Sequence, residues 1–137
     1  MNYVYLLDTN ILSELLKNPT GIVYEKVKDV GEDKICTSII VACELKFGAE
    51  KKKSAKLKER IELILTNIDI LPLIPPVEEH YAQIRTDLEN KGTPIGGNDL
   101  LIGVHALSLN LTVVTNNVRE FSRIPNLKVE NWLDKKI

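Results

Sequence analysis

The sequence predicts an α/β fold in which a short parallel sheet carries helices on both faces. Short, apolar, β-prone runs alternate with longer stretches whose apolar residues recur at helical spacing, and strands separated by helices favour parallel pairing. Right-handed crossover connections then place helices on both faces of the sheet. No internal repeat, low-complexity tract or long linker divides the 137 residues, so we expect one domain spanning residues 1–137.

Five apolar runs are the strand candidates. The first, YVYLL, ends directly at Asp8, and LTVVT is the clearest strand of the sequence because it combines β-branched residues with a short, bounded run. In chain order, the expected strands are Tyr3–Leu7, Lys34–Thr37, Ile68–Leu73, Leu111–Thr115 and Leu127–Val129.

The segments between these runs carry helix signals. Ser38 and Ser54 are suited to cap the starts of helices, Gly92 is placed to end one, and an Asn-Pro-Thr-Gly break follows Lys17. Trp132 is expected to pack the end of the chain onto the body. The expected helices are Ile11–Lys17, Ile22–Val30, Ile39–Lys51, residues 54–67, Val77–Lys91, Asn98–Leu109 and Val118–Ser122.

Composition limits the classes of function. Hydrophobic residues make up 44% and charged residues 27%, as in globular proteins, and no apolar run approaches the roughly 20 residues of a membrane helix. The first ten residues lack a secretory pattern, so a cytoplasmic location is expected. A net charge of −1 means that any RNA would be bound through a local basic face. Cys36 and Cys43 form no metal-binding pair and are expected to be reduced and mostly buried.

Acidic and amide side chains stand at the ends of the apolar elements. In open parallel sheets, sites form at the carboxyl ends of the strands. Carboxylates that converge in a half-buried cleft repel one another, which raises their pKa values or requires a cation. Mg²⁺ or Mn²⁺ would suit such oxygen ligands, and it would activate water against a phosphodiester. The candidates for this site are Asp8, Glu44, Asp99, Asn116, Asn117 and Glu120.

Each acid also has a structural interpretation. Asp8 could cap the helix that follows it, and Asp99 could be an ordinary first-turn acid. Glu44 has apolar neighbours, and an unpaired Glu is seldom buried, so it could instead pair with Lys46 or Arg85. The joint pattern favours a shared metal cleft more than any one residue does.

Other polar groups carry weaker signals. His80 and His105 are interpreted as surface or structural histidines. His80 stands beside Glu78 and Glu79 on a helix, and His105, six positions after Asp99, points to a different helix face. The lysine-rich run Lys51–Lys53 is interpreted as a solvated helix face, with contact to RNA phosphates as the alternative. Gly96 and Gly97 precede a helix and could present backbone N–H groups to a phosphate.

Four strings, in this order, resemble the VapC toxins of the PIN-domain ribonucleases over nearly the whole chain: LLDTNILSELLK, TSIIVACELKFGAE, GTPIGGNDLLIGVHAL and LTVVTNNVREFSRIPNLKVENW. The resemblance implies a PIN-like three-layer α/β/α domain. It implies an endoribonuclease that depends on Mg²⁺ or Mn²⁺, acts as the toxin of a type II toxin–antitoxin pair and could cleave tRNA. It further implies a VapB-like antitoxin, a homodimer, and contact with DNA only through the antitoxin.

The resemblance also implies roles for individual residues. Asp8 and Asp99 match the metal-binding aspartates, and Glu44 matches the acid of the second motif. Asn10 matches a neighbouring polar residue that orders the site, and Thr115 one that lines it.

The last motif departs from the family pattern. Many PIN domains place an Asp close to the position of Asn117, and an amide cannot supply that charge. Glu120 is therefore the candidate for the fourth acid, with Asn117 in support. Gly103 stands where relatives commonly have Ala, and we expect this to affect packing and not chemistry.

Two other functions compete with the ribonuclease. Asn117 leaves open a PIN-like binding module with a depleted site and weak or no catalysis. A phosphatase of the haloacid-dehalogenase type shares a strand followed by Asp, but it needs a second Asp where this chain has Asn10.

Overall fold

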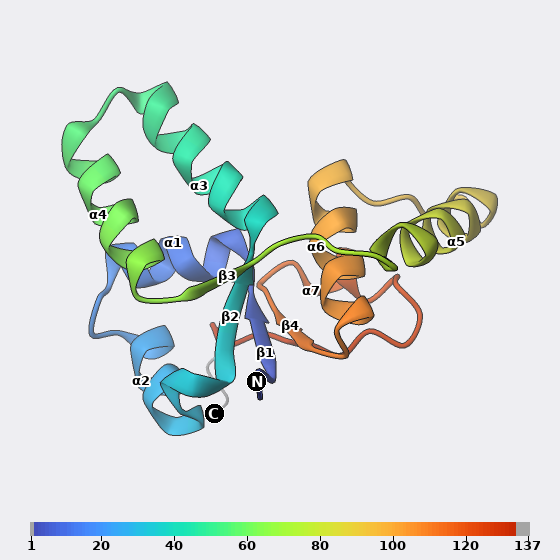
Figure 1. The fold of residues 1–137 in the computed structure, drawn as a ribbon, viewed down its shortest axis with the longest axis horizontal. Helices are drawn as coiled ribbons and strands as arrows, with labels where there is room; N and C mark the ends of the chain where they lie inside the picture. Colours follow the sequence, from blue (N-terminus) through green and yellow to red (C-terminus); the bar gives the residue numbers. More distant parts are fainter. Residues whose placement is uncertain (1, 134–137) are drawn as a thin grey trace.

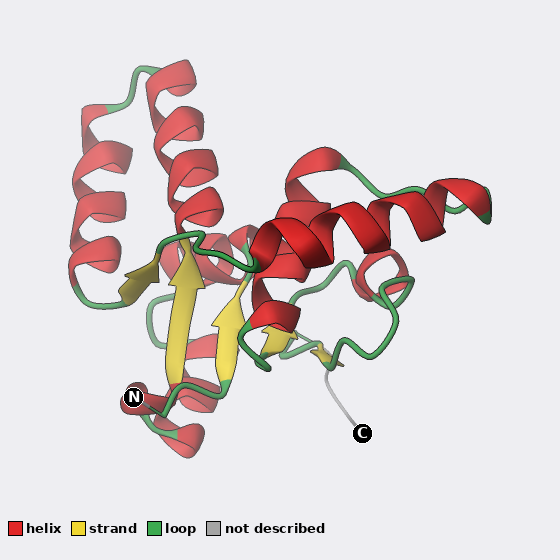
Figure 2. Ribbon diagram, turned by 45° about the vertical axis from the view of Figure 1, so that its right-hand side comes forward, coloured by secondary structure: helices red, strands yellow, loops and turns green. Residues whose placement is uncertain are grey.

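Parallel strands form the centre of the fold in the computed structural model, which describes residues 2–133. The strands all point the same way (Figure 2), and the sheet order is β3-β2-β1-β4-β5. Their bounds are β1 Tyr5–Leu7, β2 Ile35–Ser38, β3 Asp69–Leu71, β4 Thr112–Val114 and β5 Val129–Glu130.

Helices cover both faces of this sheet. Helices α1 to α4 lie on one side and α5 to α7 on the other (Figure 1), which follows from right-handed crossovers in a sheet whose order reverses between β1 and β4. The predicted three-layer α/β/α fold is confirmed. The helices are α1 Thr9–Lys17, α2 Ile22–Val30, α3 Ile39–Lys52, α4 Ala55–Thr66, α5 Val77–Asn90, α6 Gly97–Ser108 and α7 Val118–Phe121, with a 3-10 turn η1 at Glu32–Lys34.

Side-chain caps set two of the helix starts, as the sequence predicts. The Ser38 hydroxyl oxygen accepts from the Ile40 N–H at 3.1 Å at the start of α3. The Ser54 hydroxyl oxygen accepts from the Leu57 N–H at 3.1 Å at the start of α4. Gly92 follows α5 with φ +71°, a conformation that glycine adopts at little cost.

The main core lies between the sheet and its helices. The central strands are buried on both faces, which explains why they read as continuous apolar runs and not as alternating ones. Trp132 is buried, as expected, and meets the Tyr5 ring edge-on with 5.1 Å between ring centroids. A second cluster joins α5 to α6 and consists of Ile84, Leu88, Leu100, Val104 and Ile124.

The outer strands differ most from the sequence prediction. β3 covers Asp69–Leu71, fewer residues than the predicted run, and β5 covers Val129–Glu130, displaced toward the carboxyl end. Strand length in a parallel ladder depends on the paired neighbour, and the edge strands pair on one side only. An apolar run alone therefore overestimates the length of an edge strand.

The prediction for the cysteines is right for one thiol and wrong for the other. Cys36 is buried in β2, whereas Cys43 is exposed on α3. The first turns of α3 are apolar on nearly every side, so the sequence pattern could not show which face is outward.

No helix within residues 2–133 is both long and apolar enough to cross a membrane. The longest, α3 and α5, have 14 residues each.

Candidate active site at the carboxyl end of the sheet

The predicted acids gather where the strand order reverses. β1 and β4 are neighbours, but the chain leaves them toward opposite faces of the sheet. Asp8 directly follows β1, and Thr115 and Asn117 follow β4. In open α/β sheets this reversal opens a crevice beyond the strand ends, and ligands bind there.

Asp8 is held by hydrogen bonds to both of its carboxylate oxygens. The Thr115 hydroxyl donates to Oδ2 at 2.7 Å, and the Thr9 N–H donates to Oδ1 at 2.7 Å. The Thr115 oxygen in turn accepts from the Asn117 N–H at 2.9 Å. Asp8 also caps α1, so its capping interpretation is confirmed, and the same carboxylate lies at the carboxyl end of β1.

Asn117 connects two further acids. Its side-chain nitrogen donates to Asp99 Oδ2 at 3.1 Å and to Glu120 Oε2 at 2.6 Å. Asp99 lies in the first turn of α6, and Glu120 lies in α7. The Asn117 amide thus donates to both carboxylates. One of them, Glu120, is the acid that the sequence suggested in place of a charge at Asn117.

Glu44 reaches the same region from α3. The Thr9 hydroxyl donates to Oε1, and the Asn98 side-chain nitrogen donates to Oε2 at 3.2 Å. The alternative pairings of Glu44 are wrong, because Lys46 binds Glu62 at 2.8 Å.

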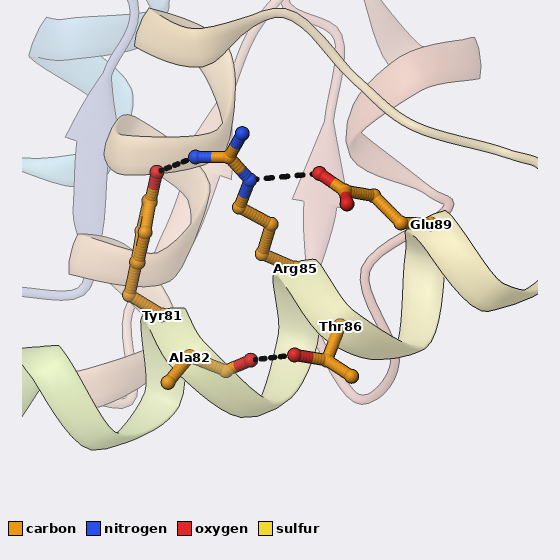
Figure 3. Close-up of polar contacts among 5 residues, drawn as sticks. All are labelled: Tyr81, Ala82, Arg85, Thr86 and Glu89. Carbon is orange, nitrogen blue, oxygen red and sulfur yellow. Dashed lines mark hydrogen bonds and ion pairs between the residues drawn. The ribbon is translucent and has the colours of Figure 1, made fainter.

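Arg85 is engaged on α5 instead of with Glu44. It donates to Glu89 Oε2 at 2.8 Å and to the Tyr81 hydroxyl at 2.7 Å (Figure 3). No cation therefore neutralises Glu44 among the described residues.

Burial and the charges of nearby carboxylates raise the pKa values of Asp8 and Asp99. Burial raises the pKa of Asp8, although the hydrogen bonds from Thr115 and Thr9 oppose this, and the Glu44 charge adds to it. Burial, with the charges of Asp8 and Glu120, raises the pKa of Asp99 to about 6. Repulsion among acids is therefore a property of this site, and a bound cation would relieve it.

Three amide and hydroxyl residues hold the edges of the site. Asn10 donates to the Asn116 side-chain oxygen at 2.9 Å and so ties α1 to the loop after β4, as a residue that orders the site would. Thr9 and Asn98, the two partners of Glu44, were missed from the sequence. Their only sequence signal is that each adjoins a candidate aspartate.

His105 lies outside this group of acids. His105 is 1% exposed, and its Nδ1 lies 2.9 Å from Ser38 Oγ, so its structural interpretation is confirmed. Within residues 2–133, no three His, Cys, Asp or Glu side chains converge closely enough to enclose a metal ion by themselves.

Comparison with known proteins identifies the family. The PIN domain model matches residues 5–127. Ribonuclease VapC2 of Rickettsia felis is 39% identical over 131 residues, covering 94% of this chain and 98% of the relative. The tRNA(fMet)-specific endonuclease VapC of Shigella flexneri is 38% identical over 132 residues, covering 93% and 97%.

A solved structure has the same fold. The crystal structure of VapBC2 from Rickettsia felis, bound to a DNA fragment from its promoter, contains a chain that matches with a TM-score of 0.87 and 38% identity, covering 94% of this chain and 98% of that one. The chain belongs to the PIN-domain family, and within it to the VapC-type proteins.

Proposed function

We propose that this protein is a metal-dependent endoribonuclease and the toxin of a type II toxin–antitoxin pair. The observation that carries the proposal is the cluster of four acids, one directly after β1 and the others on α3, α6 and α7. Within it the pKa of Asp99 is raised to about 6 by burial and by neighbouring carboxylates. The names of the VapC ribonucleases that the chain resembles support RNA as the substrate. Such an activity belongs in the cytoplasm, where RNA is available.

The donor set fits Mg²⁺ or Mn²⁺. We assign Asp8, Asp99 and Glu44 as the metal-holding residues, because their oxygens are hard ligands and their charges require compensation. Mg²⁺ usually keeps several waters and takes only one or two carboxylates directly, so three enclosing side chains are not needed. When bound, such a cation lowers the pKa of water and stabilises charge on a phosphodiester.

The surrounding residues position these acids. Thr115 and the Thr9 N–H keep Asp8 in one orientation, and Asn117 holds Asp99 next to Glu120. We propose Glu120 as the fourth catalytic acid, since its charge already acts on Asp99.

We also propose an antitoxin partner and an RNA substrate for this protein. A VapB-like antitoxin is supported by the VapBC complexes among the related structures, and one of these is bound to promoter DNA. We therefore propose that this chain approaches DNA only through its antitoxin. The tRNA(fMet)-specific relative makes tRNA the substrate to test first.

A homodimer is proposed through the outer face of α3. Ile39, Cys43 and Phe47 are spaced four residues apart and form an exposed stripe, here called the α3 stripe. Two other apolar stretches, Ile11–Leu16 and Ile61–Leu65, contribute to the core through the residues Ile11, Leu12, Ile61 and Leu65.

Asp99→Asn tests the catalytic proposal. The substitution keeps an acceptor for Asn117 but removes the charge, so we expect at least a hundredfold loss of RNA cleavage with an intact fold. Cleavage by the wild type should stop with EDTA and return with Mg²⁺ or Mn²⁺. RNA ends sequenced after brief induction, with an Asp99→Ala control, would identify the substrate.

Two controls separate catalysis from folding. Asp29→Asn, an exposed change on α2, should cleave as the wild type does, and thermal unfolding should show both variants folded. Full cleavage by Asp99→Asn would reject the assignment. Tight RNA binding without any metal-dependent cleavage would favour the binding module instead.

A further inference from the structure

A groove leads away from the acidic site between α1, α3 and α4. It has a volume of about 220 Å³, and Thr9 and Glu44 line its wall. The same two residues form a hydrogen bond within the site, so the groove and the site are continuous. Figure 1 shows α3 and α4 side by side as a hairpin that rises beyond the sheet, with α1 at its base.

The rest of this groove carries cations. Lys17, Lys52 and Arg60 line it from three different helices, and all three side chains are exposed. Among the described residues none of the three forms an ion pair, whereas Lys46 and Lys58 of the same hairpin are each bound to a glutamate. The lining of the groove therefore includes three cations without acidic partners and one carboxylate, that of Glu44.

The groove combines cationic side chains with an apolar wall. It therefore suits a ligand that carries several negative charges and also has apolar surfaces. Its apolar wall is made of Leu16, Leu45, Leu57 and Ile61. The chain as a whole has a net charge of −1, so affinity for phosphates has to come from a local basic surface. This groove is such a surface, and it opens at the acids.

We propose that this groove, the α1–α3–α4 groove, binds the RNA strand next to the phosphodiester held at the acids. Phosphates on one side of the cleaved bond contact Lys17, Lys52 and Arg60, while riboses and bases lie on the apolar wall. The inference rests on the proposed function and deepens it, since it assigns a binding path for the flanking strand.

Gly48 offers a way to close the groove without disturbing the core. It lines the groove, and a Cβ added there would meet no atom within 4 Å. Gly48→Glu and Gly48→Gln have the same size and differ only in charge. If phosphates lie here, the glutamate variant should bind RNA severalfold more weakly than the glutamine variant.

The main experiment measures the salt dependence of RNA binding. A fluorescent single-stranded RNA is titrated with the Asp99→Asn protein and with the same protein carrying Lys17→Gln, Lys52→Gln and Arg60→Gln. Each phosphate contact contributes about 0.7 to the slope of log affinity against log salt, so the slope should fall by about two. Lys26→Gln, an exposed change on α2 at a residue that does not line the groove, is the control and should leave the slope unchanged.

The outcomes separate the two proposals. An unchanged slope in the triple variant, with RNA cleavage by the wild type intact, would overturn the groove alone. Absence of any metal-dependent cleavage by the wild type would instead overturn the proposed function. Normal RNA binding with loss of co-purified antitoxin would make the groove a protein-binding site and reject the inference. Should the triple variant not fold, each single variant is expected to lower the slope by about 0.7.

Discussion

Asp99 is subject to two opposing demands. It has to be ionised to hold a cation, yet burial and the charges of Asp8 and Glu120 favour its neutral form. Because the folded protein raises the pKa to about 6 from the ordinary 3.8, the folded state binds a proton more tightly than the unfolded chain. Metal-free stability therefore falls as pH rises from about 4 to about 6, and it stays lower above that range.

Asp99→Asn should accordingly stabilise the metal-free protein above pH 6. We expect a gain of about 1 kcal/mol at pH 8, less than the full pKa shift implies because solvent screens a half-buried carboxylate. The gain should disappear near pH 4. Thermal unfolding in EDTA at both pH values measures it, and a lower Tm for the variant at pH 8 would contradict the repulsion.

Metal addition provides the complementary measurement. Mg²⁺ or Mn²⁺ at pH 8 should raise the Tm of the wild type, because a ligand that binds only the folded state stabilises it. The same addition should have little effect on Asp99→Asn. Equal increases in Tm for the wild type and for Asp99→Asn would mean that the cation binds elsewhere.

At the scale of elements, one contact joins the two helices that carry Glu44 and Asp99. The Ser38 hydroxyl caps α3 and meets His105 of α6. Burial lowers the pKa of His105, although the Pro72 carbonyl opposes this, so the imidazole is neutral at pH 7. The link between α3 and α6 is therefore a hydrogen bond between neutral groups.

Ser38→Ala should cost more than the loss of an ordinary helix cap. A lost cap costs about 1 kcal/mol, and a buried imidazole without its partner adds about 1–2 kcal/mol. Ser54→Ala removes only the cap of α4 and is the matched control, with an expected loss of about 1 kcal/mol. Urea unfolding measures both, and equal losses would mean that the link to His105 contributes nothing.

At the scale of the whole molecule, exposed large apolar side chains occur on several elements, and two of them, Ile39 and Phe47, share one face of α3. Phe47 is 67% exposed and lies in the α3 stripe, whereas Leu63 is 66% exposed on α4. Exposed large apolar groups that gather on one face are typical of an interface.

The expectation of one domain over residues 1–137 stays a prediction.

Phe47→Glu should convert the proposed homodimer to a monomer. A charge placed in the centre of an apolar interface costs several kcal/mol unless it finds a partner, so we expect at least a hundredfold weaker dimerisation. Light scattering after gel filtration measures the mass. Leu63→Glu is the control of equal exposure, and a dimer lost only in that variant would move the interface to α4.

The sequence predicted much of the site because its acids adjoin elements with clear patterns. Asp8 follows an apolar run, and Asp99 opens an apolar helix, so each could be placed at a strand end or a helix start. The length of the edge strands and the exposure of Cys43 could not be predicted in the same way. Both depend on which neighbour covers an apolar segment.

By itself, then, the sequence determined the three-layer fold and the acids Asp8 and Asp99, because periodicity and strand-end position are local properties. Only the tertiary structure decided what holds the acids. Thr115 is 107 positions from Asp8, and Asn98 is 54 positions from Glu44. Such contacts form only when elements that are distant in the sequence pack together. The α1–α3–α4 groove forms in the same way.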